Sequence, residues 1–388
     1  MKKTLVYTAI LLMIMTQSVF SQTCVSSTRN SWEWPGHNNW FIGNFSNASN
    51  QTGTMIDFKK GFTKSTTGQA ILDKGTPVYE GITSASNDKG ELVMFSNGRW
   101  AWDANSVRTS TDIKEGNEGG SIIVGSASQG IITLRHPLVP NKYYVVTTGD
   151  VIGGYGPPVS YNVFNDNGQE IQGNTMMPGG IKSTEGIAAT MHANGVDVWV
   201  TVLEATSAKI YSWLLTCDGF ISSAIVAQIA KPVSGDAGRG GLAFSHDGKK
   251  LASIFSAGGW QKDGNIIYDF DNKTGVLSNR TDIGDIRGFD VVWTKDNSKL
   301  VVGGQGLGNF LIDATTGVST QISGPDSWHH AVEIGADGNY YFNGKDGLWK
   351  WTGSGSAIKV DNSTGQGLPT MYIPPAEEPD IKEVGPFC

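Results

Sequence analysis

The chain has 388 residues, a formal net charge of −7 and a charged fraction of only 17%, whereas glycine occurs 51 times. An acidic surface of this kind makes nucleic acid and anionic membranes unfavourable partners. Aromatic residues still make up 10% of the chain, so the glycine content indicates frequent turns between short strands and not disorder. A chain of this length can bury a large core within a single domain.

Residues 1–21 have the pattern of a secretory signal peptide. Lys2 and Lys3 provide a basic start, an apolar run follows to Phe20, and Ser21 ends a small-residue cleavage site. Polar residues interrupt the run, which falls short of the ~20 apolar residues that a membrane-spanning helix needs. No later segment of the sequence could span a membrane, and we expect the protein to be secreted or displayed at the cell surface.

Three cysteines follow this leader: Cys24, Cys217 and Cys388. An odd number in an exported chain leaves one cysteine unpaired or joined to something outside this sequence. Cys217 lies in a predicted turn between two strands and is interpreted as a small space-filling residue and not as a reactive thiol. The cysteine and histidine spacings match no metal site, and the sequence predicts neither a metal nor a cofactor.

Residues 22–37 are expected to be an N-terminal extension, and strand patterns dominate residues 38–373. No helical period persists over a dozen residues there. Asn97-Gly98 between two apolar runs is a strong hairpin signal. Further strands are predicted at 142–148 with 159–164, at 196–202 with 209–215, and at 264–271, 309–313 and 347–351.

One local pattern recurs six times: a small-residue bend, a short apolar strand, a polar turn and a second strand. The clearest copies begin at Arg239, Arg287 and His329. The starts of the six copies lie between 38 and 67 residues apart, which is near the length of a propeller blade. One such unit cannot bury both its faces alone, so the copies are expected to stack around an axis.

The repeat predicts an all-β fold, a β-propeller of seven blades, with six blades as the alternative. Residues 40–58 have the pattern of second and third strands that lack a first strand, and residues 368–373 have the pattern of a first strand that lacks its followers. Joining them gives a seventh blade closed by N- and C-terminal strands, which removes exposed strand edges. Residues 374–388 are rich in proline and acids and are predicted to be a linker that leads into a possible immunoglobulin-like domain.

The segment Phe244-Ser-His-Asp-Gly-Lys-Lys-Leu-Ala resembles the repeat of WD-repeat-like propellers, although His246 stands where proline is common. The runs that begin at Trp40, Ile82, His192 and Tyr268 are similar to the N-terminal propellers of large secreted surface proteins from gliding Gram-negative bacteria. Those proteins carry immunoglobulin-like repeats and a sorting domain for type IX secretion. The resemblance covers most of the propeller region. It implies surface display and adhesion, and it brings no catalytic residues.

Each repeat places one polar residue just before its inner strand, where the six are expected to form a collar around one mouth of the central channel. One interpretation is a binding site for a polar ligand such as a sugar or a peptide terminus, because arginine binds carboxylates with two hydrogen bonds. The preferred interpretation is structural, with ion pairs across the channel that make the ring rigid. The six residues are Glu80, Glu118, Glu185, Arg239, Arg287 and His329.

Two other motifs suggest metal chemistry only weakly. His329 and His330 are adjacent, so a regular strand would point them to opposite faces and away from a shared metal. The alternating acids Asp269 and Asp271 could hold calcium, but a strand ending in a turn explains them better because the distal glutamate of an EF-hand loop is missing. The sequence contains no Gly-x-Ser-x-Gly, HExxH or P-loop motif.

Most of the twelve tryptophans are expected to pack between blades. Trp260, in a glycine-rich loop, and Tyr155, in a loop of glycine and proline, are instead candidates for ligand contact. The sequence therefore favours a non-catalytic binding and display module for an extracellular glycan or protein. The alternative is a secreted enzyme, either a polysaccharide lyase or hydrolase or a lactonase-like protein, that uses the collar carboxylates and His329.

Overall fold

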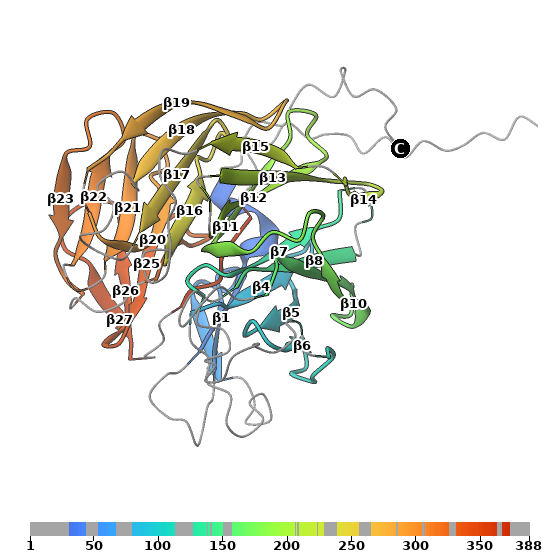
Figure 1. The fold of residues 1–388 in the computed structure, drawn as a ribbon. Helices are drawn as coiled ribbons and strands as arrows, with labels where there is room; N and C mark the ends of the chain where they lie inside the picture. The colour runs from blue at the N-terminus through green and yellow to red at the C-terminus, as the bar shows by residue number, and fades with distance from the viewer. Residues whose placement is uncertain are drawn as a thin grey trace, which may run out of the picture.

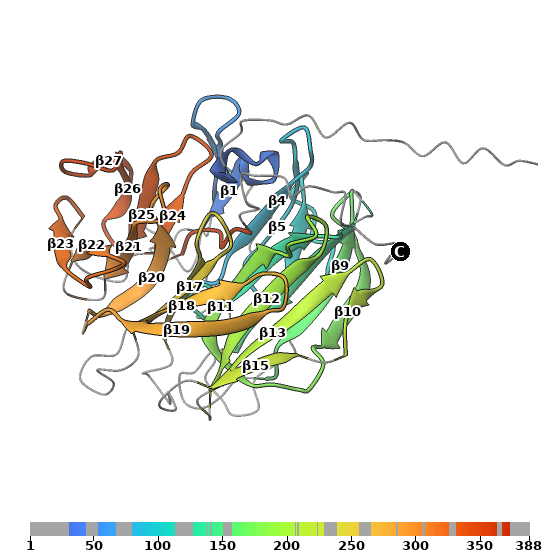
Figure 2. The ribbon, with the colours of Figure 1, turned by 90° about the horizontal axis from the view of Figure 1, so that it is seen from above.

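The computed structural model forms seven antiparallel sheets that follow one another round a ring (Figures 1 and 2). The predicted all-β, seven-bladed β-propeller is therefore confirmed, and the six-bladed alternative is wrong. The structure describes residues 31–43, 53–66, 80–111, 113, 127–137, 139, 142–149, 157–205, 207, 209–222, 224–228, 239–255, 265–284, 286–304, 306, 308–325, 331–362 and 367–372.

The first three blades contain β1 (Asn39–Ile42), β2 (Thr54–Asp57) and β3 (Thr63–Thr66); β4 (Thr83–Ser86), β5 (Leu92–Ser96) and β6 (Ala101–Asp103); and β7 (Ile131–Arg135), β8 (Lys142–Thr147), β9 (Ser160–Asn165) and β10 (Glu170–Met176). The fourth blade contains β11 (Ser183–Met191), β12 (Val198–Glu204), β13 (Lys209–Thr216), β14 (Gly219–Phe220) and β15 (Ile225–Gln228).

The last three blades have four strands each, ordered from the inside outward as they follow in the chain. They contain β16 (Gly240–Phe244), β17 (Lys250–Phe255), β18 (Ile266–Asp271) and β19 (Val276–Asp282); β20 (Gly288–Trp293), β21 (Lys299–Gly304), β22 (Asn309–Asp313) and β23 (Ser319–Ile322); and β24 (Ala331–Ile334), β25 (Tyr340–Gly344), β26 (Gly347–Trp351) and β27 (Ile358–Asp361).

The polar turn of the repeat closes the hairpin between the first two strands of a blade. In the fifth blade, the Ser245 hydroxyl oxygen accepts hydrogen bonds from the backbone N–H groups of Lys249 and Lys250, at 3.2 and 2.9 Å. In the sixth blade, the Thr294 hydroxyl oxygen has the same role and accepts a hydrogen bond from the Lys299 N–H at 3.0 Å. This shared turn explains why the repeat is visible in the sequence.

His246 shows why this turn does not carry the usual proline. Its backbone N–H donates to Asn297 Oδ1 at 2.8 Å, in the next blade, and proline has no such N–H. Its ring Nε2 lies 3.2 Å from the Trp293 carbonyl oxygen. Burial lowers the pKa of His246 to about 4, so the ring is neutral at physiological pH.

The alternating acids of the fifth blade form a strand and a turn, as the sequence analysis favoured. Asp269 lies within β18 and pairs with the Lys250 ammonium at 2.7 Å. Asp271 ends the strand and accepts hydrogen bonds from the Lys273 N–H and the Thr274 hydroxyl. Their carboxylates therefore stabilise the hairpin.

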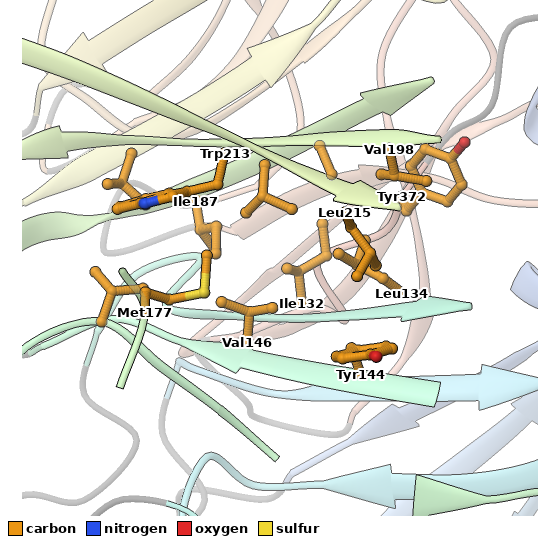
Figure 3. Close-up of a cluster of buried hydrophobic side chains, with 14 of the residues drawn as sticks. Ile132, Leu134, Tyr144, Val146, Met177, Ile187, Val198, Trp213, Leu215 and Tyr372 are labelled. Atoms are coloured by element: carbon orange, nitrogen blue, oxygen red, sulfur yellow. The ribbon is translucent and has the colours of Figure 1, made fainter. Parts of the chain in front are cut away.

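Apolar side chains fill the space between neighbouring blades. The largest cluster joins the third and fourth blades, where Trp213, Ile187 and Met177 lie together in Figure 3. The Trp213 indole N–H donates to the Pro178 carbonyl at 3.0 Å, so its one polar group is satisfied. The expectation that tryptophans pack between blades is confirmed for those with nearly fully buried side chains: Trp40, Trp102, Trp213 and Trp293.

The first blade lacks an innermost strand from the N-terminal half of the chain. The Asn39 side chain, at the start of β1, donates to the Ser86 hydroxyl at 3.0 Å, at the end of β4. Among the described residues no strand pairs with the inner edge of β1, in agreement with the interpretation of its sequence as a second strand.

The innermost position is occupied by residues 367–372, here called the closing segment. Pro369 forms a parallel bridge with Ile82, and the Thr370 N–H donates to the Ile82 carbonyl at 3.2 Å. The segment runs parallel to the chain that leads into β4, in the direction expected of an inner strand. The predicted closure by both ends of the chain is observed, although it rests on an isolated bridge and on side-chain packing (Figure 2).

Side chains of the closing segment bind it to both sides of the channel. Leu368 and Met371 pack with Trp40 in the cluster that joins the seventh and first blades. Tyr372 instead lies beside Val198 in the cluster between the third and fourth blades (Figure 3). The segment therefore fills the centre of the ring.

Residues 31–37 of the N-terminal extension lie over turns at the mouth where the inner strands end, here called the second mouth. The extension contains the 3-10 turns η1 (Ser31–Glu33) and η2 (Pro35–His37), which lie above β1 in Figure 2. The Trp32 ring lies 5.4 Å from the His246 ring, and the Lys295 ammonium lies 5.4 Å from the Trp32 ring. These contacts join it to turns of the fifth and sixth blades.

Cys217 is disulfide-bonded, so its interpretation as a space-filling thiol is wrong. Its partner lies outside the described residues, as do Cys24 and Cys388. The sequence could not reveal the bond because pairing depends on which cysteines the fold brings together. Within the described ranges, no helix is long and apolar enough to cross a membrane.

Candidate functional site in the central channel

Four of the six predicted collar residues belong to the described part of the chain. Glu80 lies shortly before β4, while Arg239 and Arg287 directly precede β16 and β20, at the mouth where the inner strands begin. This mouth is called the first mouth. Glu185 is instead the third residue of β11 and is fully buried. The other candidates lie outside the described residues: Glu118, His329, Trp260 and Tyr155.

Two collar acids meet at Ser128, shortly before β7. The Ser128 N–H and hydroxyl both donate to Glu185 Oε2 at 2.9 Å. The same hydroxyl oxygen lies 3.5 Å from Glu80 Oε2. The contact joins the second, third and fourth blades, which supports the structural interpretation for these residues. The expected pairing of Glu185 with Arg239 stays a prediction.

Glu185→Ala is expected to lower the free energy of unfolding by ~1–3 kcal/mol, because the buried Ser128 N–H loses its acceptor. Urea unfolding measures this change. The exposed Glu91→Ala serves as the control and should change stability by less than ~0.5 kcal/mol. If Glu185→Ala abolishes ligand binding and leaves stability unaltered, the collar is a binding site and not a structural support.

Gln129 extends across the channel from the third blade. Its Oε1 accepts the Leu242 N–H at 2.9 Å, and its Nε2 donates to the Val291 carbonyl at 3.3 Å. Gly241 leaves room for this side chain, since a Cβ there would lie 2.6 Å from Gln129 Oε1. The amide thus joins the inner strands of the third, fifth and sixth blades.

Asp290 on β20 is a buried acid that joins the sixth blade to the seventh. Its Oδ1 accepts the Val291 N–H at 2.7 Å, and its Oδ2 accepts the Val332 N–H of β24 at 3.1 Å. Burial raises the pKa of Asp290 to about 8, against the opposing effect of these two hydrogen bonds and of one from Gln129. The carboxyl is therefore largely protonated at neutral pH.

Glu333 on β24 is the second buried acid of the channel wall. Its carboxyl accepts the Ile334 N–H at 2.8 Å and the N–H of Met371 in the closing segment. Burial raises the pKa of Glu333 well above its usual value, and the neighbouring Asp290 raises it further. Asp290 and Glu333 are called the acid pair.

A small cavity lies in the channel beside Glu333 and the closing segment. About 30 Å³ of it is open to the centres of water molecules, which is room for one or two waters. Small-ligand pockets are typically ~300 Å³ or larger. Thr370 Oγ1 lines this cavity and is buried with no hydrogen-bond partner. Beside Glu333 and the closing segment, the described residues leave no room for a larger ligand.

The acid pair was missed by the sequence analysis, although a signal was present. Asp290 interrupts Gly-Phe-Asp-Val-Val-Trp, and Glu333 interrupts Ala-Val-Glu-Ile, so each acid lies within an otherwise apolar inner strand. The collar positions come before the inner strands, whereas Asp290 and Glu333 lie within them. A lone acid in a strand whose residues are all buried indicates a special environment.

The chemistry available to this site follows from its burial. The acid pair can hold protons and accept backbone hydrogen bonds, and both side chains are buried. Among the residues that the structure describes, no group of three or more histidine, cysteine, aspartate or glutamate side chains could hold a metal ion. The two carboxyls therefore connect neighbouring inner strands and the closing segment by accepting backbone hydrogen bonds.

No protein-family model matches the chain, and no curated protein matches it. Among solved structures it is similar to a protein from Lactobacillus plantarum, with 12% identity over 86% of this chain and 98% of that one and a TM-score of 0.50. It is also similar to a candidate 6-phosphogluconolactonase from Bacteroides uniformis, with 13% identity over 84% of this chain and 97% of that one and a TM-score of 0.43. A third similar structure is the β-propeller domain of Cps50 (Swd1) from Myceliophteria thermophila, with 11% identity over 84% of this chain and 96% of that one and a TM-score of 0.49. At such identities, similarity concerns the fold alone.

Proposed function

We propose that the protein is an exported, non-catalytic β-propeller that recognises a glycan or protein outside the cell and takes part in surface display or adhesion. The small size of the cavity beside Glu333 and the closing segment carries this proposal. The closing segment occupies the centre of the ring and residues 31–37 lie over turns at the second mouth, which leaves the face around the first mouth for a ligand. The signal-peptide pattern and the resemblance to surface propellers of gliding bacteria support the same function.

The strands that precede the predicted contact aromatics in the chain end at that face. The strand β17 ends at Phe255, opposite the start of β16, and Trp260 follows it in the chain. The strand β8 ends at Thr147, opposite the start of β7, and Tyr155 follows it. Both connections therefore leave from the first mouth, beside the collar, so the aromatics and the collar are proposed to serve one binding face.

A secreted enzyme is the second candidate, because Glu80 and Glu185 both contact the same hydroxyl. Paired carboxylates at close range are what glycoside hydrolysis requires. Full burial of Glu185 and its two hydrogen bonds from Ser128 favour the binding function instead, since a general acid must reach its substrate.

Binding and turnover can be measured on the same preparation. A glycan array and a cell-binding assay detect recognition, while reducing-sugar release and lactone hydrolysis detect catalysis. Binding without turnover supports the display module. Turnover that is lost in both Glu80→Gln and Glu185→Gln, with folding intact, would establish the enzyme.

Trp260→Ala is expected to weaken binding to cells or glycans about tenfold, because an aromatic side chain at the centre of a contact carries much of its energy. The melting curve should correspond to a stability within ~0.5 kcal/mol of the parent protein. Trp349→Ala, a half-buried tryptophan of the seventh blade, is the matched control and should leave binding unchanged. Lost stability with intact binding would instead place Trp260 in the core.

A further inference from the structure

The closing segment is held in the channel by few direct hydrogen bonds. The Thr370 N–H donates to the Ile82 carbonyl, and the Gly367 carbonyl accepts the Asn343 side-chain amide at 2.8 Å. The Met371 N–H donates to the Glu333 carboxyl. Among these partners only Glu333 can carry a charge. The Thr370 and Tyr372 hydroxyls are buried with no hydrogen-bond partner.

The groups that face Glu333 come from every element around the cavity. Asp290 lies on β20 of the neighbouring blade, and His246, in the turn after β16, is neutral above about pH 5 because burial lowers its pKa to about 4. Gln129 and Thr370 are neutral. The described residues that line the cavity include no lysine or arginine. An ionised acid pair would therefore lack a compensating cation there.

We propose that the acid pair makes the docking of the closing segment pH-dependent: the protonated pair holds residues 367–372 in the channel, and the ionised pair loosens them. This inference concerns the closure of the ring and is independent of the ligand recognised at the first mouth.

The physical reason is the cost of two like charges inside the ring. Buried carboxylates without a cation are strongly disfavoured, and two of them repel each other. The pKa values of both acids are raised, so protonation favours the closed ring at low pH, and this stabilisation is lost as pH rises through the folded-state pKa values. Glu333, Thr370 and Met371 line the same cavity, so moving the closing segment would admit water to Glu333. Burial affects its pKa more than the Met371 N–H does, so hydration lowers the cost of the charge by more than the loss of that hydrogen bond raises it.

Hydrogen exchange of the full chain tests this proposal. The protection factors of the Thr370 and Met371 amides, corrected for intrinsic rates, should fall about tenfold or more between pH 6 and pH 9 in the parent protein. The Val200 amide, at the centre of β12, should keep its protection over this range. In Glu333→Gln, which cannot ionise, the pH dependence at Thr370 and Met371 should be lost.

Glu91→Gln, an exposed acid outside the channel, is the control and should behave as the parent protein does. Asp290→Asn is a second test if Glu333→Gln does not fold, and it should reduce the pH dependence. Protection at Thr370 and Met371 that is constant from pH 6 to pH 9 would overturn the proposal. A fall shared by Val200, or one that persists in the variants, would also overturn it.

Discussion

Deletion of residues 366–388 is expected to destabilise the propeller by ~5 kcal/mol or more and to cause aggregation. The deletion removes Leu368, Met371 and Tyr372, whose side chains are at least nine-tenths buried. Burial of each such side chain contributes ~1.5–3 kcal/mol, and a typical domain is stable by only ~5–15 kcal/mol. The deletion also exposes the backbone edge before β4, where Pro369 forms its bridge with Ile82. Thermal melting and size-exclusion chromatography measure both effects.

Deletion of residues 374–388 is the matched control, because it keeps the closing segment. Both deletions remove Cys388, so any disulfide contribution from that residue is common to them. The shorter deletion should leave the protein monomeric, with a higher melting temperature than the longer one. A 366–388 deletion that stays monomeric and melts as the control does would show that the closing segment is dispensable for the ring.

Asp290→Asn is expected to remove a fall in the free energy of unfolding between pH 4 and pH 8, so the variant gains several kcal/mol of stability relative to the parent protein over this range. The pKa of Asp290 is about 8 in the folded protein and ~3.9 in an unfolded chain, so the folded state keeps a proton that the unfolded state releases. Stability should therefore fall from about pH 4 to about pH 8 by up to ~1.4 kcal/mol per pH unit. Asparagine cannot ionise and therefore removes this slope, but its amide nitrogen cannot accept a hydrogen bond, so one of the Val291 and Val332 N–H groups loses its acceptor at every pH.

Urea unfolding from pH 4 to pH 9 measures the change. Asp313→Asn is the contrasting control, because hydrogen bonds from Thr316 and Thr315 lower the pKa of that exposed carboxyl. Its charged form stabilises the fold, so Asp313→Asn should lose stability at neutral pH and lose little at low pH. A stability difference between Asp290→Asn and the parent protein that stays constant from pH 4 to pH 8 would mean that Asp290 does not retain a proton in the folded state.

The first strands and turns were predictable because their causes are local. Ser245 and Thr294 recur at the same place in their repeats, and each closes a hairpin with hydrogen bonds inside one turn. The pattern of 40–58 and 368–373 showed that two incomplete units could form one blade. Residue 373 and four of the eight candidate contact residues lie outside the described residues, so their roles stay predictions.

The acid pair could not be assigned a role from local patterns, because its environment is made by distant residues. The Val332 N–H that donates to Asp290 lies 42 residues away along the chain. The Leu242 N–H that donates to Gln129 lies 113 residues away. Likewise, Glu185 appeared to belong to an exposed collar, yet the ring places it in full burial beside Ser128. Such desolvation depends on what surrounds a side chain in space.

The sequence by itself determined the strand-and-turn repeat, because side-chain alternation and turn chemistry act over a few residues. It favoured seven blades closed by both chain ends and left six blades as the alternative. Only the tertiary structure decided that the cavity beside Glu333 is small, that Asp290 and Glu333 hold protons inside the channel, and that Cys217 is bonded. These properties arise when closure of the ring excludes water and brings together residues that are far apart in the chain.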